Sequence, residues 1–139
     1  MSLLYLLDAN VLSEPARPCP NQRVLEELVA HRGEIATAAP VWHELLYGVQ
    51  RMPPSVRRDE IARYLEQVVK RSVPILPYDE SAAAWHAAER ARLVALGRTP
   101  PFADGQIAAI AHTQGLTLVT ANQADFVSFR GLPLADWRA

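Results

Sequence analysis

The sequence has little of what exported, membrane-spanning or strongly charged proteins depend on. Cys19 is the only cysteine, so no intramolecular disulfide and no multi-cysteine metal site can form. No apolar run approaches the roughly 18 residues that a membrane span needs, and no basic segment precedes the first apolar run. We therefore expect a protein without a membrane segment that is not exported and works in the cytoplasm.

Lysine is also scarce, and the chain has no excess of positive charge. Lys70 is the only lysine, and the formal net charge of the 139 residues is −1. A nucleic-acid partner would therefore be held by local arginines or by metal rather than by a general positive field. No repeat, low-complexity segment or linker divides the chain, which predicts a single domain over residues 1–139.

What the sequence does contain is a regular alternation of apolar runs and amphipathic stretches. The apolar runs predict strands at residues 3–7, 34–38, 73–76 and 116–120, with a weaker one at 132–135. Helical periodicity and capping residues predict helices at residues 22–32, 40–49, 55–71, 79–96 and 103–113. This alternation predicts an α/β fold with three α/β/α layers and a mostly parallel central sheet. Pro74 and Pro77 flank the third strand and favour an edge position for it.

Four acidic residues occupy places where such a fold puts its chemistry. Asp8 ends the first strand, and Glu44 lies one turn into the helix that follows the second. Asp104 opens the helix after a proline-bearing loop, and Asp125 lies just beyond the strand that ends near residue 120. In open α/β sheets, sites form outside the carboxyl ends of the strands, so these four side chains are candidates for one site.

Most of these carboxylates also have a purely structural explanation. Asp8 can accept backbone N–H groups at a strand-to-helix turn, and Asp104 can cap its own helix. Asn122 and Asp125 have the three-residue spacing of a capping arrangement. Glu44 could be an ordinary rim residue, but an unpaired carboxylate is costly on an otherwise apolar helix face.

Taken together, the four carboxylates indicate a metal site. Carboxylates that converge at one sheet edge repel one another and raise each other's pKa unless cations neutralise them. Ligation by oxygen alone selects a hard divalent ion, Mg²⁺ or Mn²⁺. Such a site suits phosphodiester hydrolysis by a metal-activated water.

Four segments also resemble a known family. Residues 7–14, 41–49, 102–109 and 118–126 are similar, in order and register, to the signature blocks of PIN-domain ribonucleases. They most resemble the VapC and FitB-like toxins of bacterial type II toxin–antitoxin pairs. The resemblance implies a PIN-like fold and a divalent-metal-dependent endoribonuclease that is a homodimer, cleaves RNA and is blocked by a cognate antitoxin protein.

The resemblance also implies roles for individual residues. It makes Asp8, Glu44 and Asp104 the acidic metal site and Asp125 a more peripheral fourth member. It gives Asn10 the role of a brace and assigns Thr120 and Asn122 to shaping the loop beneath the site. One departure is Ala9, because relatives often carry threonine there. We therefore expect Asp8 and Asn10 to carry more of the site's organisation in this chain.

Other polar and aromatic residues have plainer explanations. The four histidines lack the spacing of a helical zinc motif and are assigned to structure or surface. Tyr47 and the three tryptophans are more often core or interface groups than base-stacking groups. Arg51 lies near a loop that could face a phosphate backbone, although solvated charge is the simpler reading. The helices predicted at 55–71 and 79–96 carry enough apolar residues for a groove, a dimer face or ordinary core.

Two rival functions come from other protein classes. One is a catalytically silent binding module that has kept the fold and its carboxylates. The other is a phosphoryl-transfer domain of the receiver or haloacid-dehalogenase type, which also places an aspartate after its first strand. Both subtypes need a lysine after a late strand, where this chain has none, and the second needs Asp-x-Asp where this chain has Asp8-Ala9-Asn10.

Overall fold

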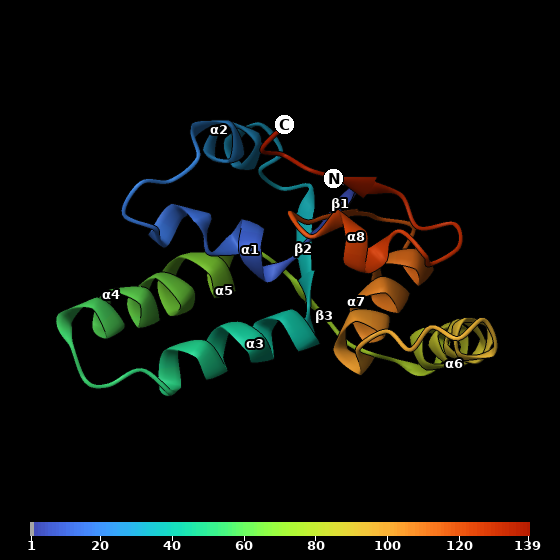
Figure 1. Ribbon diagram of the computed structural model, residues 1–139. Coiled ribbons are helices and arrows are strands. Elements are labelled where there is room, and N and C mark those ends of the chain that lie inside the picture. Colours follow the sequence, from blue (N-terminus) through green and yellow to red (C-terminus); the bar gives the residue numbers. More distant parts are fainter. Residues whose placement is uncertain (1) are drawn as a thin grey trace.

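A five-stranded parallel sheet runs through the centre of the protein (Figure 1). The computed structural model describes residues 2–139. The strands are β1 (Tyr5–Leu7), β2 (Ile35–Ala38), β3 (Ile75–Leu76), β4 (Thr117–Val119) and β5 (Leu134–Ala135), in the spatial order β3-β2-β1-β4-β5. Every neighbouring pair is parallel, so the α/β prediction is confirmed, and β3 lies at an edge as predicted.

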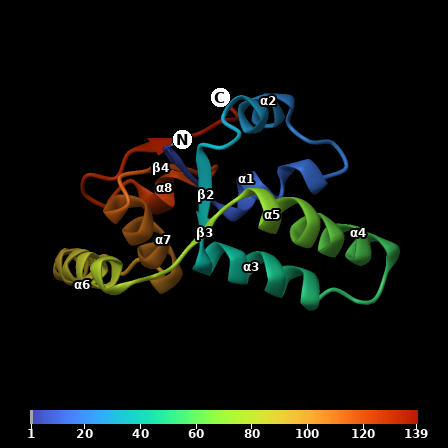
Figure 2. The same ribbon diagram turned by 180° about the vertical axis from the view of Figure 1, so that it is seen from behind.

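Helices cover both faces of this sheet. They are α1 (Ala9–Leu12), α2 (Gln22–Ala30), α3 (Ala39–Gln50), α4 (Val56–Tyr64), α5 (Lys70–Ser72), α6 (Glu80–Ala95), α7 (Phe102–Thr113) and α8 (Gln123–Phe126), with the 3₁₀ turn η1 (Glu14–Ala16) and the π-helical turn η2 (Leu65–Val69). Figures 1 and 2 place α1, α3, α4 and α5 on one side of the strands and α6 and α7 on the other. The three-layer prediction is therefore confirmed.

Local signals in the sequence set most helix boundaries. Asn21, Ser55 and Asp79 are N-caps whose side chains accept a hydrogen bond from the backbone N–H three residues later, at 3.1, 3.0 and 2.9 Å. Gly97 and Gly115 follow α6 and α7 with positive φ, which glycine adopts without steric cost. These caps explain why helix ends could be predicted from the sequence to within a few residues.

The central strands form the rigid core that carries the site. Leu6 and Leu7 of β1 are completely buried, as are Ala36 of β2 and Leu118 and Val119 of β4. Leu6 is in register with Ala36 on one side and with Leu118 on the other. Because β1 is enclosed by strands on both edges and by helices on both faces, the residue that follows it has a fixed position.

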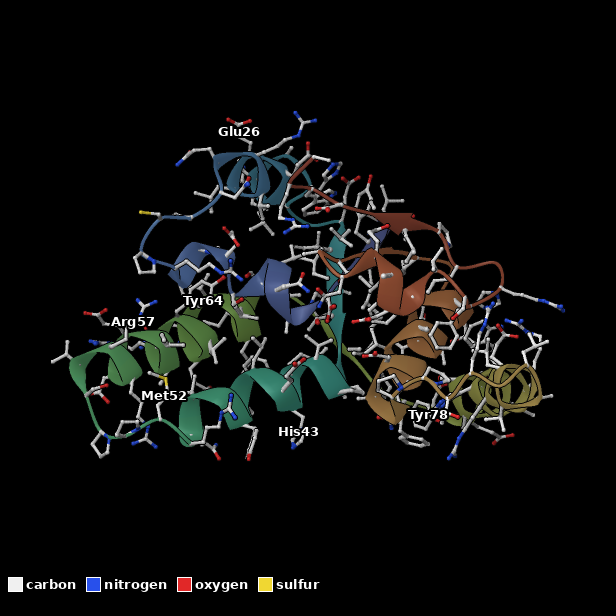
Figure 3. The ribbon with its side chains drawn as sticks, viewed as in Figure 1. Glu26, His43, Met52, Arg57, Tyr64 and Tyr78 are labelled. Atoms are coloured by element: carbon white, nitrogen blue, oxygen red, sulfur yellow. The ribbon has the colours of Figure 1, made fainter. Side chains whose placement is uncertain are left out.

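The helices predicted at 55–71 and 79–96 do not lie side by side, so their apolar residues do not form one shared surface. α4 and α6 lie at opposite ends of the molecule in both views (Figures 1 and 2). α4 is instead tied to α1, because the Tyr64 hydroxyl donates a 2.6 Å hydrogen bond to the Leu12 carbonyl (Figure 3). Among residues 2–139, no helix has both the length and the apolar character needed to cross a membrane.

Candidate active site

Asp8 lies where the order of the sheet reverses. The chain builds outward from β1 to β2 and β3, then returns to the other edge of β1 for β4 and β5. Asp8 directly follows β1 and is 6% exposed. It is also the N-cap of α1, since its Oδ1 accepts a 2.9 Å hydrogen bond from the Ala9 N–H. The turn explanation is therefore correct for one oxygen of this carboxylate.

The second oxygen of Asp8 is held by a network from the neighbouring strand. Its Oδ2 accepts hydrogen bonds from the Thr120 hydroxyl at 2.8 Å and from the Asn10 amide at 3.3 Å. Asn10 also donates to the Thr120 hydroxyl at 3.3 Å and accepts from the Ala121 N–H at 3.0 Å. The Asp8 carboxylate is therefore fixed through both oxygens, by Ala9 and Asn10 of α1 and by Thr120, the residue that follows β4.

Thr120 completes the support beneath the site. Its side chain is fully buried, and its hydroxyl accepts a 3.0 Å hydrogen bond from the Asn122 N–H while donating to Asp8. The Asn122 side chain lies at the rim of the same cavity. One hydroxyl links Asp8, Asn10 and the loop after β4. The position of that loop therefore fixes the position of the Asp8 carboxylate.

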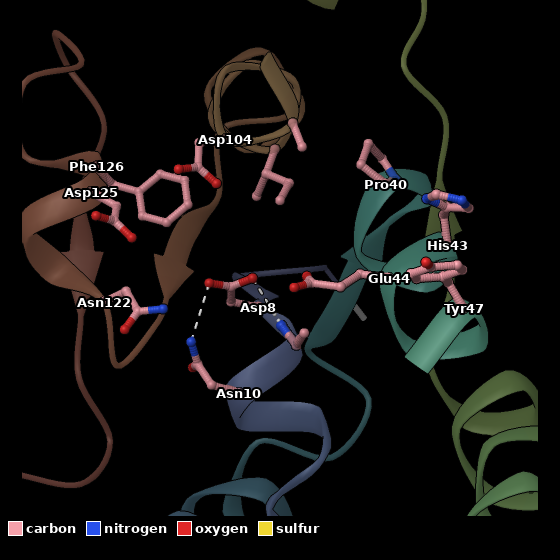
Figure 4. A pocket seen from close by; sticks show the side chains of 13 residues that line it. Asp8, Asn10, Pro40, His43, Glu44, Tyr47, Asp104, Asn122, Asp125 and Phe126 are labelled. Atoms are coloured by element: carbon pink, nitrogen blue, oxygen red, sulfur yellow. Dashed lines mark hydrogen bonds between the residues drawn. The ribbon is translucent and has the colours of Figure 1, made fainter. Parts of the chain in front are cut away.

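All four predicted carboxylates line one cavity of about 480 Å³. Asp8 forms the floor, and the other three extend toward it from separate helices (Figure 4). Glu44 comes from α3, Asp104 from the first turn of α7, and Asp125 from α8. Residues that are up to 117 positions apart in the numbering, from Asp8 to Asp125, are therefore brought together at one end of the sheet.

Burial and mutual repulsion raise the pKa values of two of these groups. The pKa of Asp104 rises to about 6, mainly because of burial and then because of the negative charges of Asp125, Asp8 and Glu44. The pKa of Glu44 is also raised, first by burial and then by Asp8, while nearby His43 lowers it. The cavity therefore holds more negative charge than its own residues neutralise, which favours a bound cation.

The capping explanations for the other two positions are not supported. α7 begins at Phe102, so Asp104 lies inside the first turn, and the N-cap residue Pro101 makes no side-chain cap bond. Asn122 occupies the N-cap position of α8, but its side chain makes no capping hydrogen bond there. Asp104 and Asp125 therefore point into the cavity without a structural task that accounts for them.

The carboxylate oxygens of the cavity suit a hard divalent cation, although they lie too far apart to coordinate one together in their present positions. Within residues 2–139, no three histidine, cysteine or acidic side chains are gathered tightly enough to hold an ion in their present positions. The cavity nevertheless offers four carboxylates, and after burial the charges of the other three raise the pKa of Asp104 further. Metal binding would draw these side chains inward and relieve that repulsion.

Part of the cavity wall was not anticipated from the sequence. Pro40, His43 and Tyr47 of α3 line one side, and Phe126 lines the other. Tyr47 is 58% exposed, so of the core and interface assignments predicted for it, the core one is wrong. Its position three residues after Glu44 on a helix was the available signal, since such residues share a face.

Comparison with known proteins agrees with the fold. A model of the PIN domain matches residues 5–131. The chain belongs to the PIN domain family. The resemblance of its four sequence segments to PIN-domain ribonucleases is therefore confirmed.

Two individual relatives are similar to this chain over most of their length. The chain is 35% identical over 128 residues to Toxin FitB of Neisseria gonorrhoeae, covering 88% of this chain and 91% of that protein. It is 30% identical over 135 residues to the tRNA(fMet)-specific endonuclease VapC of Shigella flexneri, covering 97% and 98%. Both relatives span nearly the whole PIN domain, so the likeness is not confined to one motif.

Solved PIN-domain structures show the same fold. The structure of FitAcB from Neisseria gonorrhoeae has a TM-score of 0.88 and 32% identity, covering 96% of this chain and 98% of that chain. DNA-bound VapBC from Salmonella typhimurium has a TM-score of 0.82 and 26% identity, covering 97% and 98%. The order of strands and helices described above is therefore the one found in these complexes.

Proposed function

We propose that this PIN-domain protein is a divalent-metal-dependent endoribonuclease and the toxin of a bacterial type II toxin–antitoxin pair. The observation that carries the proposal is the convergence of Asp8, Glu44, Asp104 and Asp125 on one cavity from four separate segments. The raised pKa of Asp104 supports it, because a cluster without a cation partner is electrostatically unfavourable. The VapC relatives are named as an endonuclease and a ribonuclease, which is the same reaction class, and the FitB relative is named as a toxin.

In this proposal Asp8, Glu44 and Asp104 hold the cation, Mg²⁺ or Mn²⁺, and Asp125 assists from the rim. The cation supplies positive charge for activating a water and for stabilising the negative charge that develops on the phosphodiester. Asp8 enters the reaction in a fixed orientation, because Ala9, Asn10 and Thr120 occupy the hydrogen-bonding positions behind it. Asn10, Thr120 and Asn122 are therefore positioning residues.

The same proposal assigns partners and place. The substrate is RNA in the cytoplasm, and the inhibitor is a cognate antitoxin protein, by analogy with the FitAcB and VapBC complexes. A homodimer is the expected assembly. Toxicity gives a cellular test, because expression should stop bacterial growth, while an Asp8→Asn variant should not.

The phosphoryl-transfer rival has no support at the cavity. Lys70, the only lysine, lies on α5, where it pairs with Glu66 at 3.6 Å, and it does not line the cavity. A silent binding module would share the family fold, so activity must separate it from the proposal. The four carboxylates favour the enzyme, because a binding module gains nothing from mutual repulsion.

The deciding experiment incubates purified protein with single-stranded and structured RNA in Mg²⁺, in Mn²⁺ and in chelator. Wild-type protein should cleave RNA only with metal. Asp8→Asn should cut the rate by more than about 100-fold, since even the outer partners of metal ligands are worth about 10- to 100-fold.

The control variant is Glu26→Gln, which removes an exposed carboxylate on α2 (Figure 3). It should cleave at the wild-type rate. Equal cleavage by Asp8→Asn, or cleavage that persists in chelator, would contradict the mechanism. No cleavage of any RNA by wild-type protein under all conditions would favour the silent module.

A further inference from the structure

The outer face of α3 carries an exposed aromatic column beside the acidic cavity. His43, Tyr47 and Arg51 are spaced four residues apart, so they lie one above another on the same side of the helix. The His43 and Tyr47 rings are nearly parallel, with centroids 6.3 Å apart and an interplanar angle of 21°. The Arg51 guanidinium lies over the Tyr47 ring at 5.5 Å from its centroid.

The column is open to solvent. Tyr47 is 58% exposed, and His43 and Arg51 are exposed as well. An aromatic ring in this position offers a flat apolar face together with a polar hydroxyl. The ring is therefore available to a ligand.

The column also adjoins the site where the scissile phosphate would lie. His43 and Tyr47 line the same cavity as Glu44. In Figure 4 the Glu44 carboxylate reaches toward Asp8, and the two rings lie on the α3 side of the cavity, at the other end of the Glu44 side chain. An RNA strand whose phosphate enters this cavity would pass along the wall that His43 and Tyr47 form. Aromatic side chains stack on any nucleobase, and an arginine beside them can contact the adjoining phosphate.

We propose that His43, Tyr47 and Arg51 form a stacking platform for an unpaired base of the RNA, next to the cleaved phosphodiester. This inference rests on the proposed ribonuclease function and adds a substrate requirement, namely that the nucleotide beside the cut is single-stranded. A base inside a duplex has both faces covered by its neighbours, so it cannot stack on Tyr47. The platform gives binding energy with little sequence preference, because every base has an aromatic face.

The test measures binding and turnover separately. Binding of a short single-stranded RNA is followed by fluorescence anisotropy with Ca²⁺ in place of Mg²⁺, and binding of a duplex RNA is measured in parallel. Tyr47→Ala should weaken single-strand binding between about 5-fold and about 100-fold and leave duplex binding unchanged. Tyr47→Phe, which keeps the ring, should bind within about 2-fold of wild type. In cleavage assays with Mg²⁺, Tyr47→Ala should raise KM more than it lowers kcat.

Two further variants control for bulk and for exposure. Tyr47→Leu keeps an apolar side chain without a flat ring and should bind like Tyr47→Ala. Val56→Ala truncates a side chain on α4 that is 74% exposed and does not line the cavity, and it should behave as wild type. Arg51→Gln should lower the salt dependence of binding by roughly one phosphate contact.

Several outcomes would overturn the platform. They are equal RNA binding by Tyr47→Ala and Val56→Ala, an equal loss of single-stranded and duplex binding, and full activity of Tyr47→Leu. Unchanged RNA binding together with a changed oligomeric state in Tyr47→Ala would instead assign this face to a protein interface. If wild-type protein cleaves no RNA, the proposed function fails, while the binding measurement still decides whether the platform exists.

Discussion

Removing one of the crowded carboxylates should stabilise the metal-free protein above pH 6. Asp104 is the clearest case, because burial and three neighbouring carboxylates raise its pKa to about 6. The folded form therefore binds more protons than the unfolded chain between about pH 4 and pH 6. Wild-type stability falls as pH rises through this window. Asn at this position does not titrate, so the Asp104→Asn variant escapes that loss.

The magnitude follows from the same pKa. A rise from about 4 to about 6 corresponds to roughly 3 kcal/mol at about 1.4 kcal/mol for each pH unit. The cavity opens to solvent, which screens the repulsion. We therefore expect the free energy of unfolding of Asp104→Asn to exceed that of wild type by about 1 kcal/mol at pH 7.5. At pH 4 the wild-type Asp104 carboxyl is protonated, so the two proteins should differ little in their free energy of unfolding.

Urea unfolding of both proteins at pH 4.0, 5.5 and 7.5, in chelator, measures this directly. The control is again Glu26→Gln, which removes one charge far from the cavity and should show no such pH dependence. Added Mg²⁺ should stabilise wild-type protein more than the variant and so shrink or reverse the difference. A stability change that is the same at all three pH values, or a loss at pH 7.5, would refute the assignment of Asp104 to a repulsive cluster.

Two further substitutions test the scaffold around the cavity. Gly105→Ala should destabilise the protein by about 1–3 kcal/mol in urea unfolding, because a Cβ there would overlap the buried His86 ring. An unchanged unfolding midpoint would contradict the close approach of Gly105 to His86. Thr120→Val should lower the RNA cleavage rate by about 10- to 100-fold and cost about 1–3 kcal/mol in stability, since the buried hydroxyl both orients Asp8 and accepts from the Asn122 N–H. Wild-type turnover by Thr120→Val would show that Asp8 needs no such brace.

Local patterns in the sequence were enough to predict the sheet and its helices. A continuous apolar run predicts a strand covered on both faces, and Leu6 and Leu7 are completely buried. Capping residues such as Asn21 and Ser55 fix helix starts by bonds to their own neighbours. These signals act over three or four residues, so the sequence displays them directly.

The predicted helix over residues 55–71 shows where such local reasoning ends. Its periodicity is helical throughout, yet the chain forms a π-helical turn at Leu65–Val69 between α4 and α5. Leu65 and Val69 are both buried, so packing against the rest of the molecule sets the geometry there. The separation of α4 and α6 is likewise set by the sheet topology, and their composition did not indicate it.

For the site, the sequence by itself identified the four carboxylates, because the carboxyl ends of parallel strands meet at one edge and four acidic residues occupy such places. The sequence could not show how Asp8 is held, since its partner Thr120 lies 112 residues further along the chain, directly after β4. Nor could it place Tyr47 in solvent beside Glu44, because helical spacing shows which residues share a face but not what covers that face. The sequence determines which groups are present, and only the packing of distant segments decides which of them meet, which are buried and which stay open to a ligand.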